Sequence, residues 1–278
     1  MKKSLITLVL CVLIFSASHA QNPSKIKGNR LVSIVNTEIN SFHTIALDED
    51  FRVDFIYNKI PSVEIETDEN LHEFIDFFVR DSILYFNHTK KITSKKKLNI
   101  KVMYDDFLQH FQTSDKAELN GLTPIDLTNG TLNTSGTSRV ALTLKTDNFD
   151  FESSDKSKVR LNLTADTCTI TMRGSSKIEA LINASKVLGT LKDRSYAIIE
   201  GNCDTANLEL DDNSQFNGKN FTLSTCHIIN NMSSDAYLEV LKDITIDATG
   251  ASTIYLYQNP KITINKMTDT SKLQKKMK

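Results

Sequence analysis

The chain of 278 residues has no tryptophan, only 4 cysteines and a formal net charge of −1. So few cysteines exclude a small scaffold held together by disulfides. The near balance of charge argues against a nucleic-acid-binding protein, which usually carries a basic excess. Hydrophobic residues make up 40% of the chain and charged residues 24%. This composition is typical of a globular protein and excludes disorder over the whole length.

Residues 1–20 have the pattern of a secretory signal peptide. Two lysines precede an apolar run over residues 5–15, and residues 18–20 form a small–any–small cleavage site before Gln21. The run is shorter than the about 20 apolar residues that a membrane-spanning helix needs. No later segment is long and apolar enough to cross a bilayer. We therefore expect an exported protein without a transmembrane span, located in the periplasm, at the outer surface or outside the cell.

A regular repeat occupies the second half of the chain. Each copy has a turn residue, then a small residue two positions later, then an apolar residue after two more. Serine fills the small position, at a constant step, at Ser138, Ser157, Ser176, Ser195 and Ser214. Looser copies surround Ala117, Ala236 and Ser252. Apolar residues alternate after each serine and again later in the copy, which predicts two short strands per copy, each with one buried face.

A unit this small cannot bury its own apolar face, so the copies are expected to stack. We predict an all-β protein, a right-handed parallel β-solenoid of roughly eight rungs with about 19 residues each. The small residue should lie in a tight corner, after a Gly or Asp that tolerates left-handed backbone. The residues two after the small position form one predicted inward column: Leu119, Val140, Val159, Ile178, Ala197, Phe216, Leu238 and Ile254. A β-sandwich is the alternative, but it does not explain the constant step.

The chain outside the repeat completes the predicted organisation. Residues 21–112 lack the repeat but contain several alternating segments, so they are predicted to form a strand-rich N-terminal cap or irregular first rungs. Within them, apolar residues at helical spacing over 71–78, behind Asp68 as N-cap, predict a short helix. Residues 113–266 are assigned to the solenoid and residues 267–278 to a polar tail.

Several segments carry a resemblance to a known family. Residues 42–47, 51–53, 63–71 and 83–86, followed by rungs with small-residue corners, resemble the putative auto-transporter adhesin, head GIN domain family. The resemblance covers residues 31–264. It implies an exported β-helix-like protein with surface adhesion as the expected role, and it assigns no catalytic residues. The corners here contain Asp, Asn and Lys, whereas the family's corners are commonly Gly-Ser-Gly-like.

The residue types that usually carry chemistry are scattered. No histidine pair or histidine–cysteine pair has the spacing of a zinc site, so no metal or cofactor is predicted. Cys168 and Cys226 are expected to face inward three rungs apart, too far to bridge. Cys203 and Cys226 lie in neighbouring rungs, where a disulfide needs a shift of register. Buried free thiols are therefore the default expectation.

A basic and aromatic outer face is the candidate binding site. The residues predicted to point outward near the corners include Arg139, Lys158, Arg160, Lys177, Tyr196 and Tyr237. Such a face suits an acidic surface glycan or another envelope protein. The alternative is a solvated face whose lysines discourage association of sheets. Lysines at 90–91 and 95–97 predict a solvated loop, with attachment to an anionic surface as its alternative.

The favoured hypothesis is therefore an exported, non-enzymatic solenoid that serves adhesion, surface interaction or envelope structure. The alternative is a polysaccharide lyase or hydrolase on the same scaffold, which needs clustered carboxylates or a basic residue in a groove. The ligand and the oligomeric state are left open.

Overall fold

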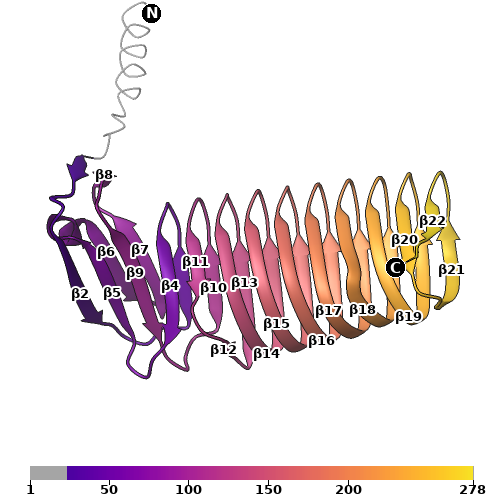
Figure 1. The fold of residues 1–278 in the computed structure, drawn as a ribbon, viewed down its shortest axis with the longest axis horizontal. Coiled ribbons are helices and arrows are strands. Elements are labelled where there is room, and N and C mark those ends of the chain that lie inside the picture. The colour runs from indigo at the N-terminus through magenta and orange to yellow at the C-terminus, as the bar shows by residue number, and fades with distance from the viewer. Residues whose placement is uncertain (1–23, 278) are drawn as a thin grey trace, which may run out of the picture.

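The computed structural model describes residues 24–277, and the predicted signal peptide lies outside them. The protein is all-β and contains a parallel β-solenoid of about 9 turns with about 19 residues per turn, as the repeat predicts (Figure 1). Within the described residues, no helix has the length and apolar character needed to span a membrane.

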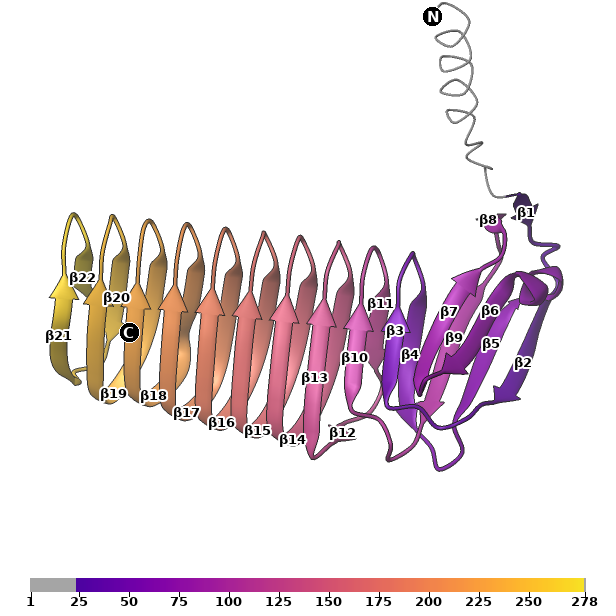
Figure 2. The same ribbon diagram turned by 180° about the vertical axis from the view of Figure 1, so that it is seen from behind.

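Each central turn of the solenoid is one long strand that bends near its middle. These strands are β14 (Arg139–Ser153), β15 (Lys158–Met172), β16 (Lys177–Leu191), β17 (Tyr196–Leu210), β18 (Gln215–Asn230) and β19 (Asp235–Ala248). Because of the bend, the first halves of the strands form one layer, here called sheet 1, and the second halves form a facing layer, sheet 2 (Figure 2). The apolar core fills the space between the two layers.

The register confirms most of the predicted inward column. Val140 pairs with Val159, and Val159 pairs with Ile178. The column was wrong at one position, because Phe216 pairs with Ala236 and not with Leu238. The corner of that rung is therefore Ser234 rather than Ala236. The cause is an additional residue in β18 after Asn217, where the register shifts, so the step there is longer than in the preceding turns.

The tight corner before each rung has the predicted backbone. A left-handed residue stands two positions before the corner in nine successive turns: Asp115, Gly136, Asp155, Gly174, Asp193, Asp212, Met232, Gly250 and Asp269. Asp and Gly, which fill eight of these nine positions, adopt this conformation at low cost, and Met232 is the exception. The corner serines from Ser138 to Ser252 are buried, as expected for small side chains at a closed turn.

Complementary side-chain volumes fill the core. Phe216 lies in a column between Ala197 and Ala236, so one large ring is flanked by two small residues. Gly218, two residues further along the strand, leaves space for the same ring. The stacked rungs reach the close packing of a protein interior in this way, although the repeat is not identical from turn to turn.

The solenoid begins earlier than the repeat does. β3 (Thr44–Leu47) and β4 (Arg52–Tyr57) pair in parallel with β10 (His110–Thr113) and β11 (Glu118–Gly121), so they form a first rung. β12 (Ile125–Asp126) and β13 (Asn129–Thr134) complete the next rung against β14. The first rung is followed by an inserted segment, residues 58–109, which supplies the antiparallel part of the cap.

The inserted segment and the N-terminal strands extend both sheets. β5 (Ser62–Asp68) lies antiparallel between β2 (Val32–Glu38) and β9 (Leu98–Tyr104), and β9 pairs with β4, which continues sheet 1. β6 (Ile75–Arg80) and β7 (Ile83–His88) form a hairpin that continues sheet 2 through β3. β1 (Lys25–Lys27) and β8 (Lys91–Ser94) form a separate two-stranded sheet.

The predicted helix over 71–78 is shorter than expected. A 3-10 helix, η1, covers only Glu69–Phe74, and Ile75 and Phe78 belong to β6. Asp68 makes no side-chain cap bond, because its carboxylate accepts hydrogen bonds from the backbone of Arg30 and Lys96 instead. Residues 75–80 thus form a strand paired with β7, although the apolar residues over 71–78 have helical spacing.

The last turns are built from shorter strands. β20 (Thr253–Tyr257) and β21 (Lys261–Met267) pair with the two halves of β19, and β22 (Lys272–Lys275) pairs with β20. Ile262 and Ile264 in β21 are exposed, since no further rung covers that face among the described residues.

Candidate functional site

The predicted basic residues lie on the outer face of sheet 1 and are brought together. Arg139, Lys158 and Lys177 are successive pairing partners in one column, because their rungs follow at the constant step. Arg160 stands in the next column on the same face, where it pairs with Glu179. Tyr196 follows Lys177 in the first column, and the Lys177 Nζ lies 5.4 Å from the centre of the Tyr196 ring.

Tyr237 lies further along the solenoid and in a different column. It pairs with Asn217 and Tyr255, which places it in line with Arg160 rather than with Tyr196. The displacement follows from the corner at Ser234. The Tyr237 and Tyr255 rings stack with centroids 4.4 Å apart, and the Lys276 Nζ lies 4.8 Å from the centre of the Tyr255 ring. The two tyrosines therefore form an aromatic patch of their own.

Two glutamates share the basic face. Glu118 contacts Arg52 at 3.5 Å and Arg139 at 3.2 Å, and Glu179 contacts Arg160 at 3.7 Å and Lys177 at 2.8 Å. The hydrogen bond from Lys177 lowers the pKa of Glu179. The basic residues could be predicted from the repeat, and so could these two partners, because Glu118 and Glu179 occupy the same outward columns.

Part of this basic face lines a shallow hollow of about 760 Å³, which lies where the cap meets the solenoid. Its lining includes four basic side chains, those of Arg52, Arg139, Lys158 and Arg160, and two acidic ones, those of Asp54 and Glu118. The guanidinium-bearing side chains are 73%, 65% and 81% exposed at Arg52, Arg139 and Arg160, respectively. The hollow thus has an excess of two positive charges on a protein whose net charge is −1.

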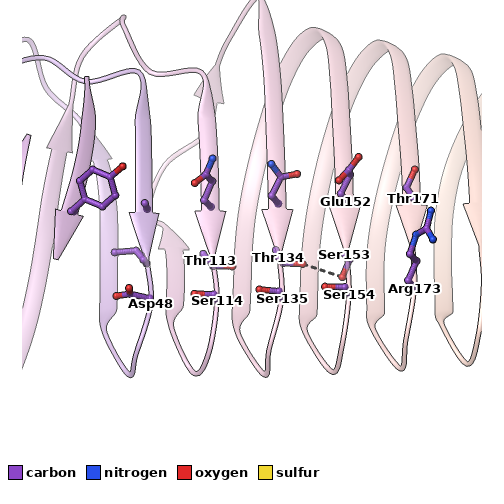
Figure 3. Close-up of a pocket in the computed structure, with 15 residues that line it drawn as sticks. Asp48, Thr113, Ser114, Thr134, Ser135, Glu152, Ser153, Ser154, Thr171 and Arg173 are labelled. Carbon is purple, nitrogen blue, oxygen red and sulfur yellow. Dashed lines mark hydrogen bonds between the residues drawn. The ribbon is translucent and has the colours of Figure 1, made fainter. Parts of the chain in front are cut away.

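A second hollow, not predicted from the sequence, lies on the outer face of sheet 2. Its volume is about 410 Å³, and it runs beside the corners of several successive rungs (Figure 3). The side chains that line it include Tyr85, Gln112, Asn133, Glu152, Thr171 and Arg173. The signal was present in the sequence as the outward residues just before each corner, whereas the predicted binding face uses those just after it.

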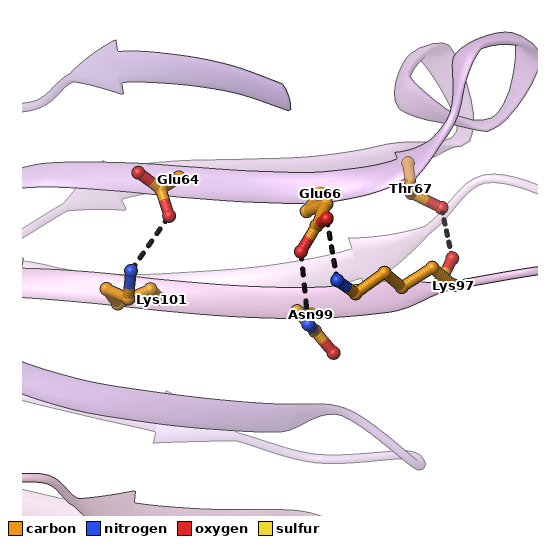
Figure 4. Close-up of polar contacts among 6 residues, drawn as sticks. All are labelled: Glu64, Glu66, Thr67, Lys97, Asn99 and Lys101. Carbon is orange, nitrogen blue, oxygen red and sulfur yellow. Dashed lines mark hydrogen bonds and ion pairs between the residues drawn. The ribbon is translucent and has the colours of Figure 1, made fainter. Parts of the chain in front are cut away.

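Several lysines of the cap contact other residues of the protein. Lys97 Nζ lies 2.7 Å from a carboxylate oxygen of Glu66, and Lys101 Nζ lies 2.9 Å from one of Glu64 (Figure 4). The Lys90 Nζ lies 4.1 Å from the centre of the Phe74 ring. The pair at Lys101 joins β5 to β9 on the outer face of the cap, and the pair at Lys97 joins β5 to the residue just before β9.

One group of potential metal ligands occurs in the described part of the chain. Ligand atoms of Glu49, Asp50 and His88 lie within 4.8 Å of one another. His88 Nδ1 is 2.9 Å from Glu49 Oε2, and its ring stacks on Phe51 with centroids 4.0 Å apart. Lysines 90, 91, 95 and 116 line the same hollow. Their positive charge opposes the binding of a cation, so the cluster is best explained as part of the packing around Phe51.

The three described cysteines are buried free thiols. Cys226 pairs with Ala206, and Cys203 pairs with Leu223, so the two thiols stand in different columns and no disulfide joins them. Burial raises the pKa of Cys168 strongly, that of Cys203 to about 11 and that of Cys226 to about 12. Thiols with such pKa values are poor nucleophiles at neutral pH, because the thiolate is the reactive form.

The fold and the two outer hollows define a class of protein, a capped β-solenoid that presents polar strand faces to its surroundings. The chain belongs to the family described as putative auto-transporter adhesin, head GIN domain, whose model matches residues 41–181 and 162–260. A comparison with curated proteins finds no match.

Solved structures share the fold at low sequence identity. A putative adhesin from Parabacteroides merdae is 17% identical with a TM-score of 0.66, over 91% of this chain and 99% of that one. A putative adhesin from Parabacteroides distasonis is 15% identical with a TM-score of 0.63, over 90% and 100% of the two chains. A protein from the same species, described as a putative lipid binding protein, is 12% identical with a TM-score of 0.63, over 91% and 98%.

Proposed function

We propose that this protein is an exported, non-enzymatic adhesin that binds an acidic partner, such as an acidic surface glycan, at the hollow on sheet 1. Its family and the related solved structures support adhesion as the general role. The observation that carries the proposal is the convergence of Arg52, Arg139, Lys158 and Arg160 on one hollow.

The ion pairs on this face leave the basic groups available. Arg52, Arg139 and Arg160 are largely exposed, and exposed pairs contribute at most about 1 kcal/mol. An anionic ligand that contacts several of these groups at once can compete with Glu118 and Glu179 for them. Arg also offers a planar fork of donors that matches carboxylate and sulfate oxygens. The neighbouring Ala141 has a side chain too small to block access.

Binding to immobilised heparin, as a model polyanion, tests the proposal. The triple variant Arg139→Ala, Lys158→Ala, Arg160→Ala should bind at least about tenfold more weakly. A matched variant with the same loss of charge, Lys186→Ala, Lys219→Ala, Lys242→Ala, removes exposed lysines outside the hollow and should bind as the wild type does. Wild-type binding should weaken as salt rises.

Two results would overturn the proposal. One is equal loss of binding in the two triple variants, which would show that net charge and not the hollow matters. The other is release of products from a panel of acidic polysaccharides, which would show an enzyme. Protease treatment of intact cells, followed by mass spectrometry of the released peptides, tests exposure at the cell surface separately.

A further inference from the structure

We infer that the hollow on sheet 2 is a second binding site, which takes an uncharged oligosaccharide lying along the solenoid axis. This site is on a different face from the basic hollow and takes a ligand of different chemistry. It therefore goes beyond the function proposed above and can be tested independently of it.

The polar side chains in this hollow have unused hydrogen-bonding groups. Among the described residues, no other protein group bonds to the side chains of Gln112, Asn133, Glu152 or Arg173. Two pairs of outward asparagines elsewhere in the solenoid are instead bonded to each other. Asn148 donates to Asn129 at 3.0 Å, and Asn202 donates to Asn183 at 3.0 Å, each across one rung. Sugars are recognised by such free amide, carboxylate and guanidinium groups, because each hydroxyl both donates and accepts.

An aromatic platform closes one end of the hollow. Tyr85 on β7 pairs with Ala46 on β3, and Ala46 pairs with Gln112 on β10. The methyl side chain of Ala46 leaves a gap between the tyrosine ring and the amide of Gln112. Phe78 stacks behind Tyr85 at 5.6 Å, and the Arg80 guanidinium lies 5.5 Å from the centre of the Tyr85 ring. The ring is thus held in place, as a surface for stacking against the apolar face of a sugar needs to be.

The length of the hollow suits an oligosaccharide rather than a single sugar. From Tyr85 to Thr171 the outward column crosses five strand spacings, which is about 24 Å at about 4.8 Å each. Ser114, Ser135 and Ser154 contribute one half-buried hydroxyl per rung along its side (Figure 3). A polar group thus recurs at every rung, which suits a ligand that also repeats.

The charge of the hollow separates it from the basic site. Asp48 and Glu152 are acidic and Arg173 is basic, so the lining has one negative charge in excess. Polyanions are repelled by this balance, whereas an uncharged chain of sugars is not. The two hollows therefore differ in ligand class as well as in position.

An array of uncharged oligosaccharides, followed by calorimetry with the best ligand, tests the inference. Tyr85→Ala should weaken binding about tenfold, and Tyr85→Phe should bind nearly as the wild type does because the ring remains. The double variant Gln112→Ala, Asn133→Ala should also weaken binding. Asn207→Ala, an exposed asparagine on the same sheet outside the hollow, should leave it unchanged.

The outcomes distinguish this site from the basic one. The triple variant at Arg139, Lys158 and Arg160 should bind uncharged oligosaccharides normally. If no uncharged oligosaccharide binds the wild type, or if the double variant retains full affinity, the inference is wrong. The double variant changes only exposed solenoid residues, so it keeps the test decisive even if Tyr85→Ala fails to fold.

Discussion

Asp193 accepts a hydrogen bond through Oδ2 from the backbone N–H of Gly174, which lies one rung earlier, at 2.7 Å. The same arrangement joins Asp155 to Gly136 at 2.9 Å and Asp269 to Gly250 at 3.0 Å. Each bond links two consecutive left-handed turn residues. The corner is therefore fixed both by its own backbone conformation and by the aspartate of the next rung.

Substitutions at this corner should lower stability. Gly174→Ala is expected to cost about 1–3 kcal/mol, because the residue has φ +69 and a Cβ would lie 2.8 Å from the backbone nitrogen of Asp155. Asp193→Ala should cost about 1 kcal/mol through the lost hydrogen bond. Urea unfolding measures both, with Lys156→Ala at an exposed turn position as the control. An Asp193→Ala variant as stable as the wild type would contradict this role.

Two corner serines should respond in opposite ways to removal of the hydroxyl. Ser176 Oγ donates to the carbonyl oxygen of Arg173 at 2.8 Å, whereas the buried Ser195 Oγ has no partner among the described residues. Ser176→Ala should therefore lower the free energy of unfolding by about 1 kcal/mol. Ser195→Ala should leave it unchanged or raise it. Thermal and urea unfolding of the two variants provide the comparison, and equal losses would show that the hydroxyls have the same environment.

Phe216 and Gly218 should be energetically coupled. A Cβ at position 218 would lie 2.5 Å from the Phe216 ring, so Gly218→Ala should destabilise the wild type. Phe216→Ala should cost about 3–5 kcal/mol by leaving a cavity. In the Phe216→Ala background, Gly218→Ala should cost much less, because the clash is gone. A double-mutant cycle measures the coupling, and strictly additive costs would refute it.

His110 should titrate at lower pH than a free histidine. Burial, and then the neighbouring His43, lower the pKa of His110, and the two rings lie 5.7 Å apart. A lowered pKa in the folded state gives stability that is present above the usual value of about 6.5 and lost as the pH falls through the folded pKa. NMR titration of the ring protons gives the pKa. In the His43→Gln variant, the pKa of His110 should rise only part of the way to the usual histidine value, since the burial of His110 remains.

The buried cysteines should resist alkylation in the folded state. Cys168, Cys203 and Cys226 are buried and have raised pKa values, so iodoacetamide should modify them only after unfolding. Peptide mapping with and without urea and reductant is the measurement. A peptide linking Cys203 to Cys226 under non-reducing conditions would contradict the observed register.

The solenoid could be predicted from the sequence because its period is visible in it. Equal steps from Ser138 to Ser214 fix which residues share a column, and every pairing over that range follows. The prediction failed at Ala236, because a single added residue in β18 is accommodated by a shift inside the strand. The spacing of residues in the sequence does not show at which position of a rung the register shifts to accommodate an added residue.

The cap and the second hollow depend on contacts that no period reveals. β5 lies between β2 and β9, and these antiparallel pairs join segments that are distant in the chain and share no repeat. Tyr85 is brought beside Ala46 only through the pairing of β7 with β3. The basic residues and their neutralising partners could be found because they follow the repeat, but the hollow itself required the three-dimensional arrangement.

The recurrence of one corner in nine consecutive turns allows the length of the solenoid to change by whole turns. Each turn contacts chiefly the turn before it and the turn after it, so a whole turn can be added or removed without disturbing the others. Each such change alters the reach of the protein by about 4.8 Å and leaves the cap with its adjoining hollows intact. The length of the solenoid and the side chains of the two hollows can therefore evolve separately in this architecture.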